Sequence, residues 1–108
     1  IQFNDYDNEL LYNNLHEITT EICNVNGFEE QNKIFKDALK IIESASIKGI
    51  TGGKVPENVA AAAVFLSCIR NGYQISRYDM AKNVKPSGTT IQNIAKELND
   101  ELRLNASL

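Results

Sequence analysis

Apolar side chains recur every three or four positions in two stretches in the first half of the chain. In the first stretch they are Leu11, Leu15, Ile18, Ile22 and Val25, and in the second they are Ile34, Phe35, Ala38, Leu39, Ile41 and Ile42. This spacing places each set on one face of a helix, so the sequence predicts helices over residues 9–24 and 29–46. Gly27 separates the two, and Glu29 and Glu30 suit the positive N-terminal end of the second helix.

A glycine-rich segment, SIKGITGGKVPEN, comes next and predicts a loop, because glycine adopts turn conformations without steric penalty. Pro56 suits the first turn of a third helix, where its missing N–H has no intrahelical partner. Residues 59–69 carry no charge. A helix without a polar face cannot cover the surface, so we expect this one at the centre of the fold, with Gly72 ending it in a left-handed conformation.

The last third of the chain predicts a short helix, SRYDMAKNV, a break at residues 85–88, and a longer helix, TTIQNIAKELNDEL. Ser76 and Asp79 fit a capping box, and Ser87 is expected to cap the last helix. Helical spacing predicts that the last helix buries Ile91, Ile94, Ala95, Leu98 and Leu102. We expect the tail LNASL to fray.

These elements predict an all-α domain of five helices, with a central apolar helix and a C-terminal helix-turn-helix over about residues 76–103. The domain is expected to span residues 9–104, between an N-terminal tail at 1–8 and a C-terminal tail at 105–108. With 108 residues, the chain is too short for a second hydrophobic core. No apolar run reaches the roughly 18 residues that a membrane span needs, so no membrane association is expected.

The chain starts with Ile1, and its opening IQFNDYDN lacks the basic and apolar regions of a signal peptide. We therefore expect a fragment of a longer protein, monomeric as it stands.

No catalytic residue, cofactor or metal site is predicted. Cys23 and Cys68 lack companion ligands at metal-binding spacing and are expected to pack as small hydrophobes in a reducing, intracellular setting. His16 has no partner in a catalytic pattern and is expected to be solvated. Tyr73 and Tyr78 are expected to cover the edge of the core rather than to stack on nucleic acid.

The distribution of charges along the chain is more informative about a binding partner than the net charge of -3. Residues 1–43 carry three lysines against nine acids, residues 44–96 carry seven basic residues against two acids, and residues 97–108 carry one basic residue against three acids. A basic segment therefore lies inside an acidic chain, and it includes the helix-turn-helix.

Reading DNA requires polar side chains at the start of a helix that enters the major groove. Here the start of the last helix offers Thr89, Thr90, Gln92 and Asn93, which can bond to adenine, thymine or phosphate. Phosphate contacts are expected from the flanking residues Arg77, Lys82, Lys85, Ser87 and Lys96. A plain helix pair of a bundle, without DNA contact, is about equally compatible with the spacing alone.

The stretches GGKVPENVAAAAVFLSCIRNGYQIS and SGTTIQNIAKELNDEL resemble the cyclin-type repeat of the transcription factor IIB family. The resemblance covers residues 10–103 and rests on Gly53-Lys54, on Pro56 before the small-residue helix, and on Thr90-Ile91 at the start of the last helix. The Pro and the Thr-Ile pair are more similar to the second of the family's two repeats.

This resemblance implies a cyclin-like domain that binds promoter DNA together with the TATA-box-binding protein and helps to recruit RNA polymerase II in the nucleus, without catalysis. It also implies that Lys54 contacts a phosphate or the TATA-box-binding protein, although a solvated loop lysine is an equal alternative. In the family's second repeat, the positions of Thr89 and Gln92 read an element upstream of the TATA box. Many relatives have an apolar residue and an arginine there, so the resemblance carries over phosphate contact but not the reading of that element.

Two alternatives remain at the level of sequence. One is a cyclin-like module that binds a kinase or another protein and never contacts DNA, which the acidic first helix and the pI of about 5.1 favour. The other is the related initiation factor of RNA polymerase III, which has the same repeat. The start of the last helix and the basic middle segment favour promoter DNA.

Overall fold

A computed structural model describes residues 5–108, with side chains from residue 9 onward. It contains five helices: α1 (Asp5–Asn26), α2 (Gln31–Ile47), α3 (Pro56–Arg70), α4 (Arg77–Ala81) and α5 (Gly88–Glu101). No strand occurs among the described residues, which confirms the predicted all-α, five-helix class. The first helix begins at Asp5, earlier than predicted, and the fourth ends at Ala81, earlier than the predicted SRYDMAKNV.

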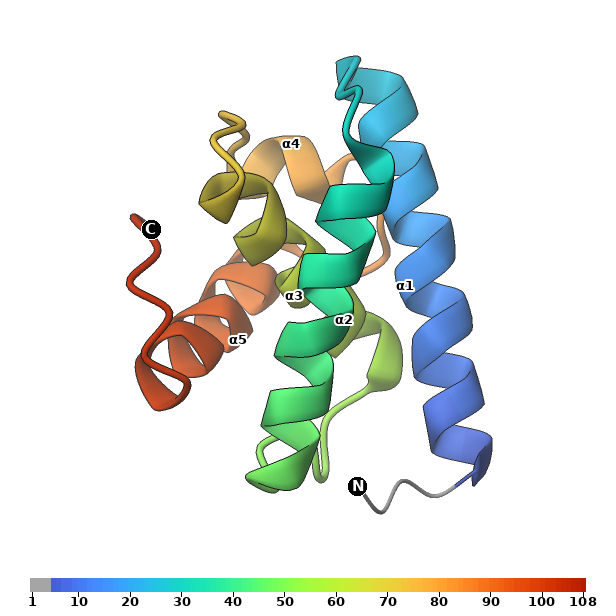
Figure 1. Ribbon diagram of the computed structural model, residues 1–108, viewed down its shortest axis with the longest axis vertical. Helices are drawn as coiled ribbons and strands as arrows, with labels where there is room; N and C mark the ends of the chain where they lie inside the picture. Colours follow the sequence, from blue (N-terminus) through green and yellow to red (C-terminus); the bar gives the residue numbers. More distant parts are fainter. Residues whose placement is uncertain (1–4) are drawn as a thin grey trace.

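The central position predicted for the third helix is confirmed. All residues from Val59 to Cys68 of α3 are buried, and α3 packs against each of the other four helices. Figure 1 shows α1 and α2 side by side, with α3 behind α2 and α5 on the far side from α1. Four consecutive alanines, Ala60 to Ala63, are completely buried, so backbones of neighbouring helices can approach α3 closely.

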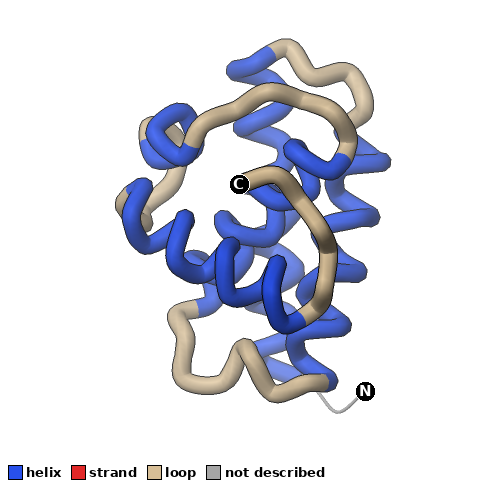
Figure 2. The backbone as a smooth tube through the Cα atoms, turned by 90° about the vertical axis from the view of Figure 1, so that its left-hand side faces the viewer, coloured by secondary structure: helices blue, strands red, loops and turns tan. Residues whose placement is uncertain are grey.

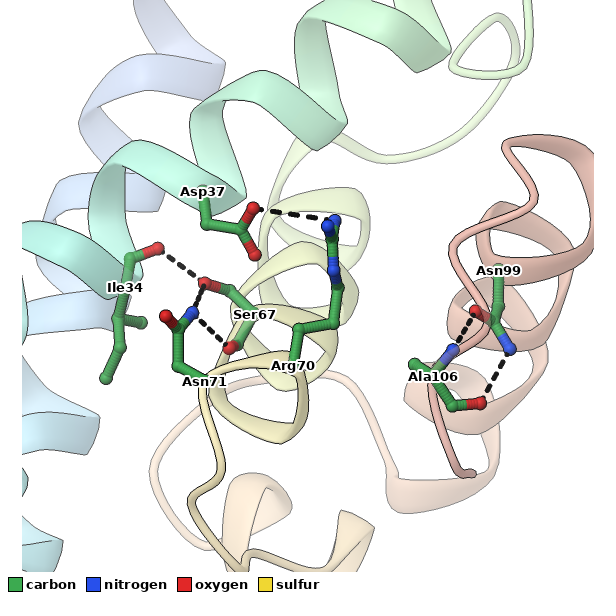
Figure 3. Close-up of polar contacts among 7 residues, drawn as sticks. All are labelled: Ile34, Asp37, Ser67, Arg70, Asn71, Asn99 and Ala106. Carbon is green, nitrogen blue, oxygen red and sulfur yellow. Dashed lines mark hydrogen bonds and ion pairs between the residues drawn. The ribbon is translucent and has the colours of Figure 1, made fainter.

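A buried hydroxyl joins the two helices at the centre. Ser67 of α3 donates a hydrogen bond of 2.7 Å to the carbonyl of Ile34 in α2, and Asn71 in turn donates to the carbonyl of Ser67 (Figure 3). Nearby, Arg70 forms an ion pair of 3.4 Å with Asp37. These contacts fix the end of α3 against the outer helix α2.

The residues that begin and end α3 are those predicted from the sequence. Pro56 begins α3, and Gly72 follows its end with φ 86. The N–H groups of Gly72 and Tyr73 donate to the carbonyls of Ile69 and Cys68, which is the Schellman pattern of a helix terminus.

Two predictions of burial and one prediction of a frayed tail were wrong. Val25 is 57% exposed although it shares the helical spacing of the buried α1 residues, and Tyr78 is 63% exposed instead of covering the core edge. The tail does not fray, since the Asn99 side chain bonds both the N–H and the carbonyl of Ala106 (Figure 3). Figure 2 shows this segment folding back over α5.

Candidate nucleic-acid interface

The helix-turn-helix begins with a capped short helix. The Ser76 hydroxyl accepts from the N–H of Asp79 at 3.0 Å, and the Asp79 carboxylate accepts from the N–H of Ser76 at 3.1 Å. This is the predicted capping box. The Ser76 N–H, which donates to the Asp79 carboxylate, holds the pKa of that carboxyl below its ordinary value because it favours the charged form, and the Ser76 side chain lowers this pKa further. The capping box therefore fixes where α4 starts, although the helix has only five residues.

Apolar contacts hold the turn between α4 and α5. Met80 and Pro86 are buried, and Val84 packs against the core. Gly88 begins α5 so close to α4 that a Cβ there would lie 3.4 Å from both the Cγ and the carbonyl oxygen of Arg77. The start of α5 thus lies close against Arg77, the first residue of α4.

The start of α5 is capped as predicted. The Ser87 hydroxyl accepts from the N–H of Thr90 at 3.2 Å and donates to the Thr90 hydroxyl at 3.1 Å. Both hydroxyls are therefore used within the cap. Their contribution to a DNA contact would be indirect, through the placement of their neighbours.

The outward face of α5 carries the remaining predicted polar residues. Thr89, Gln92, Asn93 and Lys96 follow helical spacing on the side opposite the buried Ile91, Ala95 and Leu98. Thr89, Asn93 and Lys96 are exposed and Gln92 is half-buried. The same face continues into Asp100, so polar side chains and positive charge are combined on α5 only between Thr89 and Lys96.

The lysines of the turn are exposed, but each has an acidic neighbour. Lys82 lies 3.9 Å from the Asp79 carboxylate and Lys85 lies 4.0 Å from the Glu57 carboxylate, with 76% and 88% of their side chains exposed. Ion pairs this exposed contribute about 0–1 kcal/mol, so phosphate can displace the carboxylates at little cost.

Two predicted contact residues are placed differently from the rest. The Lys54 ammonium donates to the carbonyl of Ile50 at 2.7 Å and pairs with Glu97 at 3.1 Å, so it lies beside the second half of α5 and not at its start. Arg77 is half-buried, and its guanidinium donates to the Tyr78 hydroxyl at 3.0 Å. Lys54 is therefore separated along α5 from the predicted residues at the start of the helix.

Glu57 is a neighbour of the turn that the sequence did not reveal. Its carboxylate accepts from the N–H of Lys85 at 3.4 Å and connects the first turn of α3 to the turn before α5. Nothing in the local sequence links two residues 28 positions apart. Glu57 also lines a hollow of about 660 Å³ between α1 and the turn, together with the α1 residues Asn14, His16, Glu17, Ile18, Thr20 and Glu21 and the turn residues Asn83 and Lys85.

The described residues contain no group of three or more His, Cys, Asp or Glu side chains arranged to hold a metal ion. Among them, no helix has both the length and the apolar character needed to cross a membrane.

Cys23 and Cys68 are free and buried, as predicted, and burial raises the pKa of the Cys68 thiol to about 12. A thiol with so high a pKa stays protonated at neutral pH and is therefore unreactive.

The chain matches the family model described as transcription factor TFIIB repeat over residues 10–101. It is similar to Transcription initiation factor IIB of Caldivirga maquilingensis, with 35% identity over 71 residues, which cover 66% of this chain and 21% of that protein. It is also similar to Transcription initiation factor IIB of Saccharolobus shibatae, with 31% identity over 85 residues, which cover 79% of this chain and 27% of that protein. The chain thus spans between about a fifth and under a third of the length of these curated relatives.

Proposed function

Because this chain belongs to the family of the transcription factor TFIIB repeat, we propose that it is the DNA-binding domain of a general transcription initiation factor. The domain acts by binding, without catalysis. It binds promoter DNA together with the TATA-box-binding protein and helps to assemble RNA polymerase II in the nucleus. The relatives, which are transcription initiation factors IIB, support this proposal.

The observation that carries the proposal is the start of α5. Thr89 and Asn93 are exposed there, Gln92 is half-buried beside them, and Lys96 follows one turn later. Amide side chains at such positions can pair with adenine, while lysines at the edge release counterions from phosphates. The close approach of Gly88 to Arg77 holds this end of the helix beside α4.

Most of the binding energy should come from Lys82, Lys85 and Lys96, because neither Thr89 nor Gln92 can form the bidentate contact to guanine that an arginine makes. The domain therefore binds DNA mainly through its phosphates, and its base preference is weak. Discrimination between promoters would then come from the TATA-box-binding protein.

A band-shift titration on TATA-containing DNA with the TATA-box-binding protein tests this proposal. Changing Lys82, Lys85 and Lys96 to Gln should weaken complex formation and lower the slope of log affinity against log salt by about 2 to 3, at roughly 0.9 for each lost phosphate contact. Changing the same residues to Arg keeps the charge and should leave the complex intact. Unchanged binding by the Gln variant would refute the proposed surface.

The hollow beside Glu57 favours a second candidate, a cyclin-like protein-interaction module. Glu17, Glu21 and Glu57 line it, and three carboxylates repel phosphate but suit a basic polypeptide. Under this alternative, changing Glu17 and Glu21 to Gln would weaken capture of a lysine-rich peptide, whereas the chain would show no salt-dependent affinity for DNA.

A further inference from the structure

The outward face of α2 is basic, although it lies in the most acidic part of the sequence. Lys33, Lys36 and Lys40 are all exposed and are separated by three and four residues. They therefore form one row on the side of α2 opposite its buried residues, which are Ile34, Ala38, Ile41, Ile42 and Ala45. The nine acids of residues 1–43 conceal this row in any count along the chain.

These lysines have fewer acidic neighbours than the lysines of the helix-turn-helix. Among residues 9–108, no carboxylate lies within ion-pair distance of Lys36 or Lys40. Lys33 lies 3.9 Å from Glu30 with both side chains at least half exposed, so this pair contributes little. The charge of the row is therefore available to a partner.

The row borders two hollows that extend the positive surface. One, of about 280 Å³, lies between the row and the end of α3, where Arg70 and Asn71 line it. The other, of about 490 Å³, continues past Lys40 to Lys48 and Arg103. We define the α2 basic surface as Lys33, Lys36, Lys40, Lys48, Arg70 and Arg103.

The acids in these hollows are few. Asp37 lies beside Arg70, with which it pairs at 3.4 Å (Figure 3). Glu101 is the only other acid that lines either hollow among the described residues, and its carbonyl accepts from the Lys48 ammonium at 2.8 Å. With Glu30 beside Lys33, six cationic side chains thus have three acidic neighbours, on a chain whose net charge is -3.

We propose that the α2 basic surface binds the phosphate backbone of a second segment of nucleic acid. Lysines in a row act as point charges that neutralise phosphates without reading bases. An acidic protein is the less suitable partner, because protein interfaces are depleted in lysine and depend on apolar or aromatic anchors. Between Lys33 and Lys40 the described structure has no exposed large hydrophobic residue.

This surface is distinct from the one at the start of α5. The hollow that contains Lys40 and Arg103 is also lined by Glu101 and Leu102, at the C-terminal end of α5. The fourteen residues of α5, at 1.5 Å each, place its start roughly 20 Å from that end. The domain therefore presents one DNA-binding surface near each end of α5, and it can hold two duplex segments together.

The test measures the affinity of the chain for a short duplex of arbitrary sequence by fluorescence anisotropy over a range of KCl concentrations. Changing Lys33, Lys36 and Lys40 to Gln should lower the slope of log affinity against log salt by about 2 to 3. The matched Arg variant should keep the wild-type slope. Adding the Gln changes at Lys82, Lys85 and Lys96 should abolish the remaining affinity for the duplex, since the two surfaces bind separately.

A second readout uses two duplexes that carry a donor and an acceptor dye. The wild-type chain should bring them together and produce energy transfer, and either set of Gln changes should abolish the transfer. The inference is overturned if the α2 Gln variant keeps both slope and transfer, or if its only loss is binding to polyglutamate. If only the Lys82, Lys85 and Lys96 changes leave the affinity for DNA unaltered, the proposed function fails, whereas a lower slope in the α2 Gln variant still identifies the α2 basic surface as a phosphate-binding surface.

Discussion

Arg103 occupies a position that glycine occupies at the ends of three other helices. It follows α5 with φ 53, whereas Gly27, Gly49 and Gly72 follow α1, α2 and α3 with φ between 70 and 86. The N–H groups of Arg103 and Leu104 bond to the carbonyls of Asp100 and Asn99 in the same Schellman pattern. A side chain in this conformation is strained, because its Cβ approaches the backbone too closely.

Changing Arg103 to Gly should therefore stabilise the fold by about 0.5–1 kcal/mol, the strain relieved being partly offset by the greater freedom of glycine in the unfolded chain. Urea denaturation followed by circular dichroism measures the change. The reverse exchange, Gly72 to Ala, should destabilise the fold by about 1 kcal/mol. A destabilised Arg103→Gly variant would show that the Arg side chain makes a larger contribution than its backbone costs.

The capping box at α4 predicts a pH dependence. The folded-state pKa of Asp79 is below its ordinary value of 3.8, so its contribution to stability is complete above 3.8 and is lost as the pH falls through the lower folded value. Asp79→Ala should accordingly be less stable than wild type near neutral pH, and the difference should shrink on acidification below 3.8. A difference that stayed constant through that range would mean that the carboxylate charge has no part in the cap.

At the scale of elements, the close packing around α3 determines which substitutions the fold tolerates. Ala62 is completely buried between helices, so a larger side chain there forces the neighbours of α3 apart. Ala62→Leu should destabilise the domain by about 1–3 kcal/mol in urea denaturation. Ile47→Leu, at a position that is 67% exposed, is the control and should change stability by less than about 0.5 kcal/mol. Equal effects of the two changes would contradict a tightly packed α3.

The helices were predictable because their signals are local. Pro56, the uncharged run after it, Ser76 with Asp79, and Ser87 each act within one or two turns. The tail was not predictable, since it is held by Asn99, whose amide looks like any surface polar group in the sequence. The exposure of Tyr78 depends on how α4 is oriented, which no local pattern encodes.

The candidate site likewise has features that the sequence predicted and features that it did not. Helical spacing alone predicted that Thr89, Asn93 and Lys96 face outward on α5. The pairing of Lys85 with Glu57 and of Lys54 with Glu97 depends on contacts between distant segments, so neither ion pair could be predicted from local sequence patterns. The α2 basic surface was hidden for a related reason, because a count of charges along the chain averages over the faces of a helix.

At the scale of the whole molecule, charge is separated by face rather than by segment. The hollow between α1 and the α4–α5 turn is lined by three glutamates and Lys85, while the outer row of α2 carries three lysines. A net charge of -3 therefore limits non-specific attraction to polyanions without preventing contact at particular faces. Binding should accordingly weaken steeply with salt even though the chain as a whole is acidic.

The central claim is that the start of α5 contacts DNA, and a titration of the isotope-labelled chain with duplex DNA, followed by amide chemical shifts, tests it most directly. The account predicts that amides between Lys85 and Lys96 shift and saturate together as DNA is added. If binding saturated while those amides kept their positions, the claim would be contradicted.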